Sequence, residues 1–452
     1  MHCQRGGKPP FNSEELLSLA VSGFLLGSPS AASKPEIAIN LWKTRSFALE
    51  YLREPTSGSR AKLLSDYQRN LTPRVPIDEI AQLIGYLPPV EPEPNLTSGP
   101  RMVKAGPRGK TEYELVLPPE YTHNRSYPVL LALPHAGERT QAMTRRLATA
   151  AADNGYILAS IEWGGRGAER WGFTPEEHDT VLDVLRDLRR RFQIDSDKVF
   201  LTGLGEGAKG VYDVGLSHPD LFAGILPVAG APLFFPRRYW RNAQFLPVYA
   251  VAGTRIVGEN GAAIREQFTN WVARGFPAIW VEYKGRGQEW LGGEVPLMFD
   301  WMRAQTRAFP MQRLGSDGGG GVFGTEFSTF RAEDNRWYWV STTGVHRRCQ
   351  MPKERWSNFV SPATMTASVN TESNAVQIKT AGLTNVSLWI GRNAQGKYLL
   401  DLDRPITVRH GITTMWLDKR LPASLEVLMK DLYERADRKH LFVARLDMEI
   451  RP

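Results

Sequence analysis

The sequence predicts an α/β fold in which helices cover both faces of a doubly wound, mostly parallel sheet. The first observation is an alternation, beginning near residue 110, of short apolar runs with longer amphipathic runs. Apolar strands separated by helices are typical of a parallel sheet that is buried on both faces and joined by right-handed crossovers. The expected strands are 111–117, 127–133, 156–163, 198–202, 223–228, 247–252 and 279–283.

The second observation is a well-marked helix start. Thr174 can cap the helix, Pro175 suits its first position, and Glu177 can close a capping box. Apolar residues then recur at helical spacing and give the helix one buried face. These residues are Val181, Leu185, Leu188 and Phe192.

The third observation is a glycine-bounded turn, Gly203-Leu204-Gly205-Glu206-Gly207, between an apolar strand and a helix. This is the strand–turn–helix context of a nucleophile elbow, whose usual pattern is G-x-S-x-G. Gly205 stands at the position of the nucleophile and has no side chain to attack a substrate.

Other patterns flank this region and predict a multidomain chain. Residues 12–86 are expected to be helical, and the proline-rich stretch 87–109 is expected to link them to an α/β domain at 110–312. Short runs of β-branched and aromatic residues predict a β-sandwich-like C-terminal domain at 322–452.

Within the C-terminal domain, a helix at 424–435 and a strand at 441–445 are expected to complete the β-rich fold. The alternation in Arg336–Val340 would place Trp337 and Trp339 on one face of a strand. These tryptophans suit either a binding surface or burial between domains.

The composition argues against several classes of protein. The net charge of +8 is spread among acidic residues without a nucleic-acid motif, so no nucleic-acid partner is expected. Cys3 and Cys349 are too few for a disulfide framework, and no His or Cys spacing suggests a metal site or another cofactor. No apolar run reaches the roughly 18 residues of a membrane span.

The stretch 16–27 suits either a core helix or the apolar core of a signal peptide. A cytoplasmic location is therefore the default expectation, and export stays open.

On the elbow, the strands and the segment 217–224 (SHPDLFAG), residues 110–307 resemble the α/β-hydrolase superfamily, especially esterases and peptidases of the feruloyl-esterase and polyhydroxybutyrate-depolymerase type. The resemblance implies that the catalytic acid would stand at Ile256 and the catalytic histidine at Gln288. It also implies oxyanion-hole-like backbone donors at Ala136 and Glu206. The sequence therefore predicts a degenerate catalytic triad.

These observations leave three hypotheses about function. The first is a catalytically inactive homologue that binds a small-molecule, carbohydrate or aromatic ligand, or a protein partner. The second is a divergent ester or peptide hydrolase that uses Glu206 and His135 in the same crevice. The third, weaker hypothesis is a scaffold in which the helical N-terminus and the β-rich C-terminus bind.

Aromatic and basic residues are expected to line the crevice, or else to pack its loops. The candidates are His135, Trp163, Trp171, Arg238, Trp240 and Trp290. Of the other histidines, His178 is expected to be solvated at a helix start, and His218 is expected to be structural.

Overall fold

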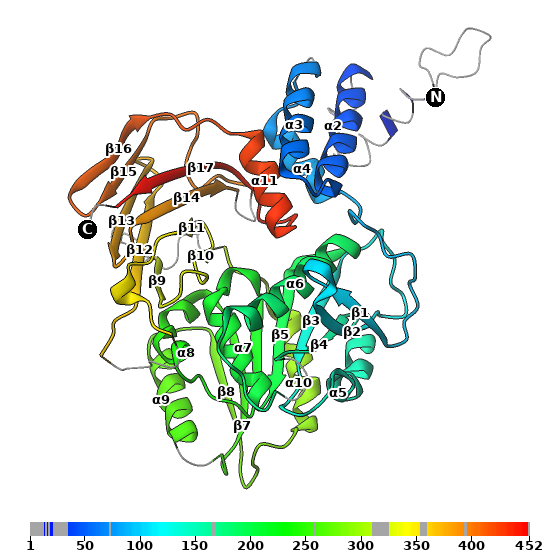
Figure 1. Cartoon of the computed structure of the whole chain (residues 1–452), viewed down its shortest axis with the longest axis vertical. Helices are drawn as coiled ribbons and strands as arrows, with labels where there is room; N and C mark the ends of the chain where they lie inside the picture. The colour runs from blue at the N-terminus through cyan, green and yellow to red at the C-terminus, as the bar shows by residue number, and fades with distance from the viewer. Residues whose placement is uncertain are drawn as a thin grey trace. The chain divides into compact units, whose positions relative to one another are not determined.

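The computed structural model describes residues 35–71, 74–164, 168–256, 259–309, 325–352, 359–392 and 396–450, together with Ser13, Leu16, Leu19 and Ala20. Two compact units make up the chain (Figure 1). One comprises residues 1–92 and 423–444, and the other comprises 93–422 and 445–452. Most of the stretch 16–27, the glycine-rich stretch 315–321 and Trp356 lie outside the described residues.

The smaller unit is helical. Helices α2 (Pro35–Arg53), α3 (Ser57–Asn70) and α4 (Ile77–Gly85) are joined by α11 (Leu425–Arg435) from the far end of the chain. Helix α11 packs on α2, and the rings of Tyr51 and Tyr433 meet edge to face at 6.4 Å. The late helix was predicted at the right residues, but it completes the helical unit rather than the β-rich domain.

The larger unit is built on an eight-stranded sheet with the order β1-β2-β4-β3-β5-β6-β7-β8. Strand β2 pairs antiparallel with β1 and with β4, and all other neighbours are parallel. The strands are β1 (Arg101–Ala105), β2 (Thr111–Val116), β3 (Tyr127–Leu133), β4 (Ile157–Ile161), β5 (Ile194–Leu204), β6 (Gly224–Val228), β7 (Val248–Gly253) and β8 (Ala278–Tyr283). The predicted sheet is confirmed, with one further strand, β1, inside the stretch assigned to the linker.

Helices cover both faces of this sheet (Figure 1). Side chains of α6 (Pro175–Arg191), α7 (Glu206–Ser217) and α9 (Glu259–Ala273) share one apolar core. Those of α5 (Thr140–Asp153) and α10 (Val295–Ala304) share the other. Strand β3 supplies both cores: Val129 and Leu131 face the first, and Leu130 faces the second. Its continuous apolar run is thus explained by burial on both faces.

The chain of the larger unit continues into two further sheets. A five-stranded sheet has the order β16-β15-β13-β12-β9, and a four-stranded sheet has the order β10-β11-β14-β17. Their bounds are β9 (Thr325–Thr329), β10 (Arg336–Trp337), β11 (Val340–Ser341), β12 (Ala363–Asn370), β13 (Ala375–Ala381), β14 (Asn385–Gly391), β15 (Ile406–His410), β16 (Thr413–Lys419) and β17 (Phe442–Glu449).

The prediction of one strand over Arg336–Val340 is wrong. Trp337 pairs with Val340 across a tight hairpin, and Tyr338 takes a φ of 55° at its turn. A φ in this region is unusual for an aromatic residue and is not signalled by sequence alternation. Trp337 and Trp339 are both buried, so they are packing residues.

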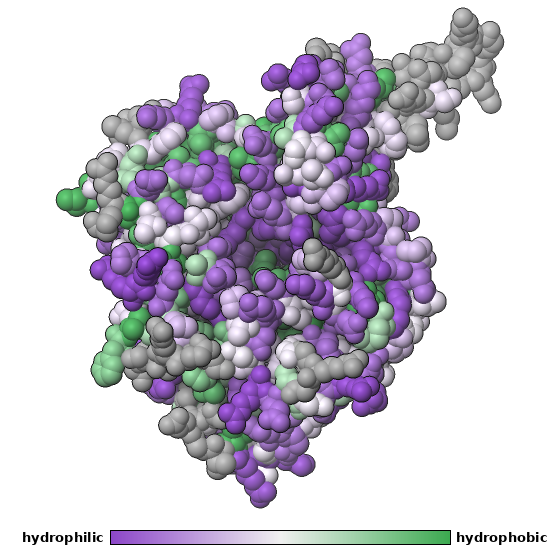
Figure 2. Space-filling model, in the orientation of Figure 1, coloured by the Kyte–Doolittle hydropathy of each residue, from purple (hydrophilic) through white to green (hydrophobic). Residues whose placement is uncertain are grey.

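On the face drawn in Figure 2, hydrophilic residues predominate and hydrophobic residues are scattered. Among the described helices, none is both long and apolar enough to cross a bilayer.

The cap of α6 gives a first test. Thr174 accepts a hydrogen bond from the Glu177 backbone, and the Glu177 carboxylate accepts one from the Thr174 backbone, so the predicted capping box is confirmed. We expect Thr174→Ala to lower the free energy of opening the first turn of α6 by about 1 kcal/mol, measured by native-state hydrogen exchange. Thr56 is the matched control, because it precedes α3 without a side-chain cap bond. An equal effect of Thr56→Ala on α3 would contradict this explanation.

Candidate active site at the elbow after strand β5

The elbow is formed by the end of β5, a turn at Gly205 and the start of α7 at Glu206. Gly205 has φ 57° and ψ −110°, and its N–H donates to the Val228 carbonyl at 2.9 Å. A Cβ at Gly207 would lie 2.4 Å from the Leu133 carbonyl oxygen, so only glycine allows α7 to approach β3 this closely. The strained, glycine-bounded turn expected from the sequence is present.

The imidazole of His135 occupies the space at the tip of the elbow. A Cβ built on Gly205 would lie 2.0 Å from His135 Nδ1, which is far inside van der Waals contact. The backbone N–H of Glu206 donates to the same Nδ1 at 3.3 Å. In a neutral imidazole, Nδ1 is therefore the acceptor and Nε2 carries the proton. The structure thus places His135 against the elbow itself, where a nucleophile's side chain would stand.

The loop that carries His135 is held by an ion pair. Both oxygens of Glu138 accept hydrogen bonds from Arg146 at 2.6 Å, and Glu138 also accepts from the His135 backbone at 3.3 Å. The hydrogen bonds from Arg146 lower the pKa of Glu138 below its ordinary value. The Arg146 guanidinium lies 5.7 Å from the Trp290 ring, so Trp290 belongs to this edge of the sheet as expected. Ala136 and Trp290 are both half-buried.

The turns predicted to carry the acid and the histidine lie side by side. The Arg255 N–H donates to the Arg286 carbonyl at 2.8 Å, and the Gly285 N–H donates to the Thr254 hydroxyl at 2.8 Å. These turns follow β7 and β8, at the carboxyl ends of their strands. Ile256 is buried in an apolar cluster, whereas Gln288 is exposed.

The carboxylate of Glu206 already has partners. One oxygen accepts from the Trp171 backbone at 3.0 Å, and the other forms an ion pair with Lys209. The carboxylate therefore holds the start of α7 against the segment around Trp171. The catalytic role considered for Glu206 remains a prediction.

Two of the expected crevice tryptophans are core residues. Trp163 is buried and donates through Nε1 to the Pro134 carbonyl at 2.9 Å. Trp171 is buried and donates through Nε1 to Asp213 Oδ2 at 3.0 Å. The placement of these residues at an open crevice is wrong, because each indole N–H finds a partner inside the fold.

The placement of Arg238 and Trp240 at the crevice is also wrong. Trp240 stacks on Phe276, just before β8 begins, with ring centroids 6.1 Å apart, and its carbonyl accepts from Trp271. Arg238, at the end of the short helix α8 (Phe235–Arg238), lies 5.8 Å from the ring of Phe330. After β6, the chain returns along α7 to the amino-terminal edge of the sheet, and these residues lie there rather than beside the elbow.

His178 differs from its predicted environment as well. It is 3% exposed, and its Nε2 lies 2.8 Å from Asp213 Oδ2. The expectation of a solvated histidine considered only the polar start of α6. It could not include Arg331 and Asp334, which reach the same cluster from beyond β9.

The sheet order, the antiparallel first strands and the elbow after β5 define the larger unit as an α/β-hydrolase fold. The loops after β7 and β8 carry Ile256 and Gln288, the positions that the family resemblance assigns to the acid and the histidine.

No family model matches the chain. A protein of Nocardia uniformis subsp. tsuyamanensis, named "Putative esterase NocK", is 31% identical over 138 residues, which is 28% of this chain and 39% of that protein. The chain thus spans well under half of this relative. Similar solved structures include a thermostable esterase at 17% identity, covering 46% of this chain and 63% of that one, with a TM-score of 0.38. A poly(3-hydroxybutyrate) depolymerase from Bordetella parapertussis has 14% identity over 46% of this chain and 92% of that one, also with a TM-score of 0.38.

The contact between Gly205 and His135 gives a second test. We expect Gly205→Ala to destabilise the larger unit by about 1–3 kcal/mol through the positive φ alone, and by more through collision with the imidazole. In a double-mutant cycle with His135→Ala, the double variant should be less destabilised than the sum of the single variants by about 1 kcal/mol, measured by denaturant unfolding. If the effects of the two single variants on the free energy of unfolding are strictly additive, the imidazole moves away from position 205 without a cost in free energy.

Proposed function

We propose that this protein is a non-hydrolytic member of the α/β-hydrolase fold class that acts by binding a ligand or a protein partner. The observation that carries the proposal is the position of His135. Its ring occupies the space of a nucleophile's side chain and uses the Glu206 N–H, which the family resemblance makes an oxyanion donor. A bound ester could reach neither a nucleophile nor that donor without moving the ring.

The residues at the other two catalytic positions support the same proposal. An isoleucine buried among apolar neighbours offers no carboxylate to orient a base, and the exposed amide of Gln288 cannot take up a proton near neutral pH. Together with Gly205, these residues leave none of the three groups of a serine triad at the expected positions.

The same edge offers groups for binding. His135 and Trp290 are half-buried, and exposed Arg139, Arg255 and Arg286 lie on loops at the carboxyl ends of the strands. Aromatic surface with nearby guanidinium groups favours a ligand or a protein segment that carries carboxylates. This choice of partner belongs to the proposal.

Activity assays test the proposal directly. We expect the purified chain to release no p-nitrophenol from short-chain esters above the buffer rate and to resist labelling by a fluorophosphonate probe. Turnover that is abolished by Glu206→Gln or His135→Ala would overturn the proposal in favour of a divergent hydrolase. Lys209→Met is the matched control, because it breaks the ion pair of Glu206 and leaves both candidate groups in place.

Restoring the triad tests two causes of inactivity separately: the absence of the three catalytic groups and the blocking of the elbow by His135. The triple variant Gly205→Ser, Ile256→Asp, Gln288→His should be labelled only weakly by the probe, because the new side chain at position 205 collides with the His135 ring. Adding His135→Ala should open the site and give labelling. If the triple variant is labelled equally well with His135 present, then the imidazole does not block the elbow.

A further inference from the structure

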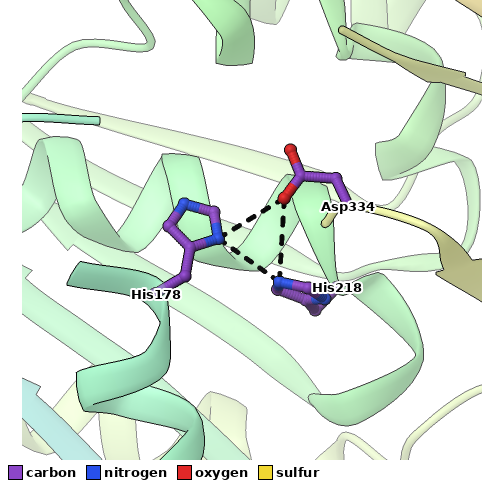
Figure 3. A group of neighbouring side chains, drawn as sticks. All are labelled: His178, His218 and Asp334. Carbon is purple, nitrogen blue, oxygen red and sulfur yellow. Dashed lines mark hydrogen bonds and ion pairs between the residues drawn. The ribbon is translucent and has the colours of Figure 1, made fainter. Parts of the chain in front are cut away.

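A cluster of buried polar side chains lies at the end of α7 away from the elbow. Its members come from three places in the fold: His178 from the first turn of α6, His218 from just after α7, and Asp334 from the loop after β9 (Figure 3). His178 and Asp334 are 3% and 1% exposed, and the side chain of His218 is 12% exposed. This cluster is separate from the elbow, and its geometry is the same whether or not the elbow hydrolyses esters.

Three atoms of the cluster converge on one point (Figure 3). His178 Nδ1 lies 3.3 Å from His218 Nε2 and 3.6 Å from Asp334 Oδ1, and the latter two atoms are 3.9 Å apart. A point equidistant from all three atoms lies about 2.1 Å from each, which is the length of a zinc bond to nitrogen or oxygen in proteins.

The other polar atoms of His178 and Asp334 are already engaged, and their bonds fix the orientation of these two side chains. His178 Nε2 lies 2.8 Å from Asp213 Oδ2 and 3.2 Å from the Arg331 guanidinium; the carboxylate is the shorter contact, and we assign the imidazole proton to it. Asp334 Oδ2 accepts from Arg331 at 2.6 Å and from Ser217 at 3.1 Å. A carboxylate behind a histidine is the usual support of a metal-binding imidazole, because it fixes the tautomer and turns the free lone pair outward.

A neutral His218 can donate at most one proton from Nε2, either to His178 Nδ1 at 3.3 Å or toward Asp334 Oδ1 at 3.9 Å, so these two acceptors cannot both be satisfied by it. With its proton on Nε2, neutral His178 presents a lone pair at Nδ1 toward Asp334 Oδ1 and His218 Nε2. Asp334 Oδ1 is buried and has no hydrogen-bond partner among the described residues. Arg331 compensates the carboxylate at Oδ2, whereas Oδ1 faces the two imidazole nitrogens, where a metal ion would give it a partner.

We propose that His178, His218 and Asp334 form a binding site for a divalent transition-metal ion of the zinc type. Two imidazoles and one carboxylate are ligands that zinc commonly takes. The ion would join α6, the end of α7 and the loop after β9, so its role is to fasten the β-rich segment to the hydrolase sheet.

The test is metal binding by the full-length chain. After removal of metal with EDTA, titration with ZnCl₂ followed by calorimetry and elemental analysis should give one ion per chain. Cobalt should give the visible absorption bands of a four- or five-coordinate site with nitrogen and oxygen ligands. His218→Ala removes the most exposed ligand, and we expect it to weaken binding by about 100-fold or more, beyond the loss typical of changes to residues that only support a ligand.

His346→Ala is the matched control, because His346 is an exposed histidine outside the cluster, and this variant should bind as the wild type does. Equal binding by the wild type and His218→Ala would overturn the proposal, as would uptake well below one ion by the wild type. Should His218→Ala fail to fold, the wild type alone decides. A cobalt spectrum without these bands, or a melting temperature unchanged by zinc, would then refute the site.

Discussion

The larger unit depends on one buried cation. The Arg331 guanidinium donates to Asp213 at 2.9 Å, to Asp334 at 2.6 Å and to the Phe173 carbonyl at 3.0 Å, and it lies 4.5 Å from the Phe235 ring. Burial opposes its charge, but the two carboxylates outweigh that penalty and raise the pKa of Arg331 further above its ordinary range. Burial opposes ionisation of Asp213 as well, yet Arg331 and then His178 lower the pKa of this carboxyl. Removing one member of such a group typically costs about 3–5 kcal/mol, because its partners stay buried and charged.

Much of the α/β-hydrolase core could be predicted from the sequence because its signals are local. Continuous apolar runs such as that of β3 reflect burial on both faces, and the cap at Thr174 is specified by adjacent residues. The elbow is visible because glycine is required at Gly203 and Gly207, where a Cβ would lie 2.7 Å and 2.4 Å from neighbouring backbone atoms. Each of these features is specified by residues next to one another in the chain.

The wrong predictions concern partners far apart in the chain. The sequence suggests that Trp163 and Trp171 lie on surface loops. In the structure, their indole N–H groups donate hydrogen bonds to Pro134 and Asp213 inside the fold. Trp240 follows a strand, yet a return of the chain along α7 carries it to the opposite edge of the sheet. The position of His135 at the elbow could not be foreseen either, since a glycine in the sequence does not show what occupies the space beside it.

The contacts between the β-rich segment and the hydrolase sheet determine where the chain can be cut into fragments without opening a buried core. Asn242, fully buried, donates to the Leu216 and Ser328 carbonyls at 2.8 and 3.0 Å and accepts from the Ser328 backbone at 2.9 Å. A fragment ending near residue 312, where the sequence suggests a boundary, would take Ser328 away from Asn242 and Arg331 away from Asp213, and these buried groups would lose those partners. The segment after residue 324 is therefore part of the core of the hydrolase sheet. Expression of the α/β region as a separate module would divide that core.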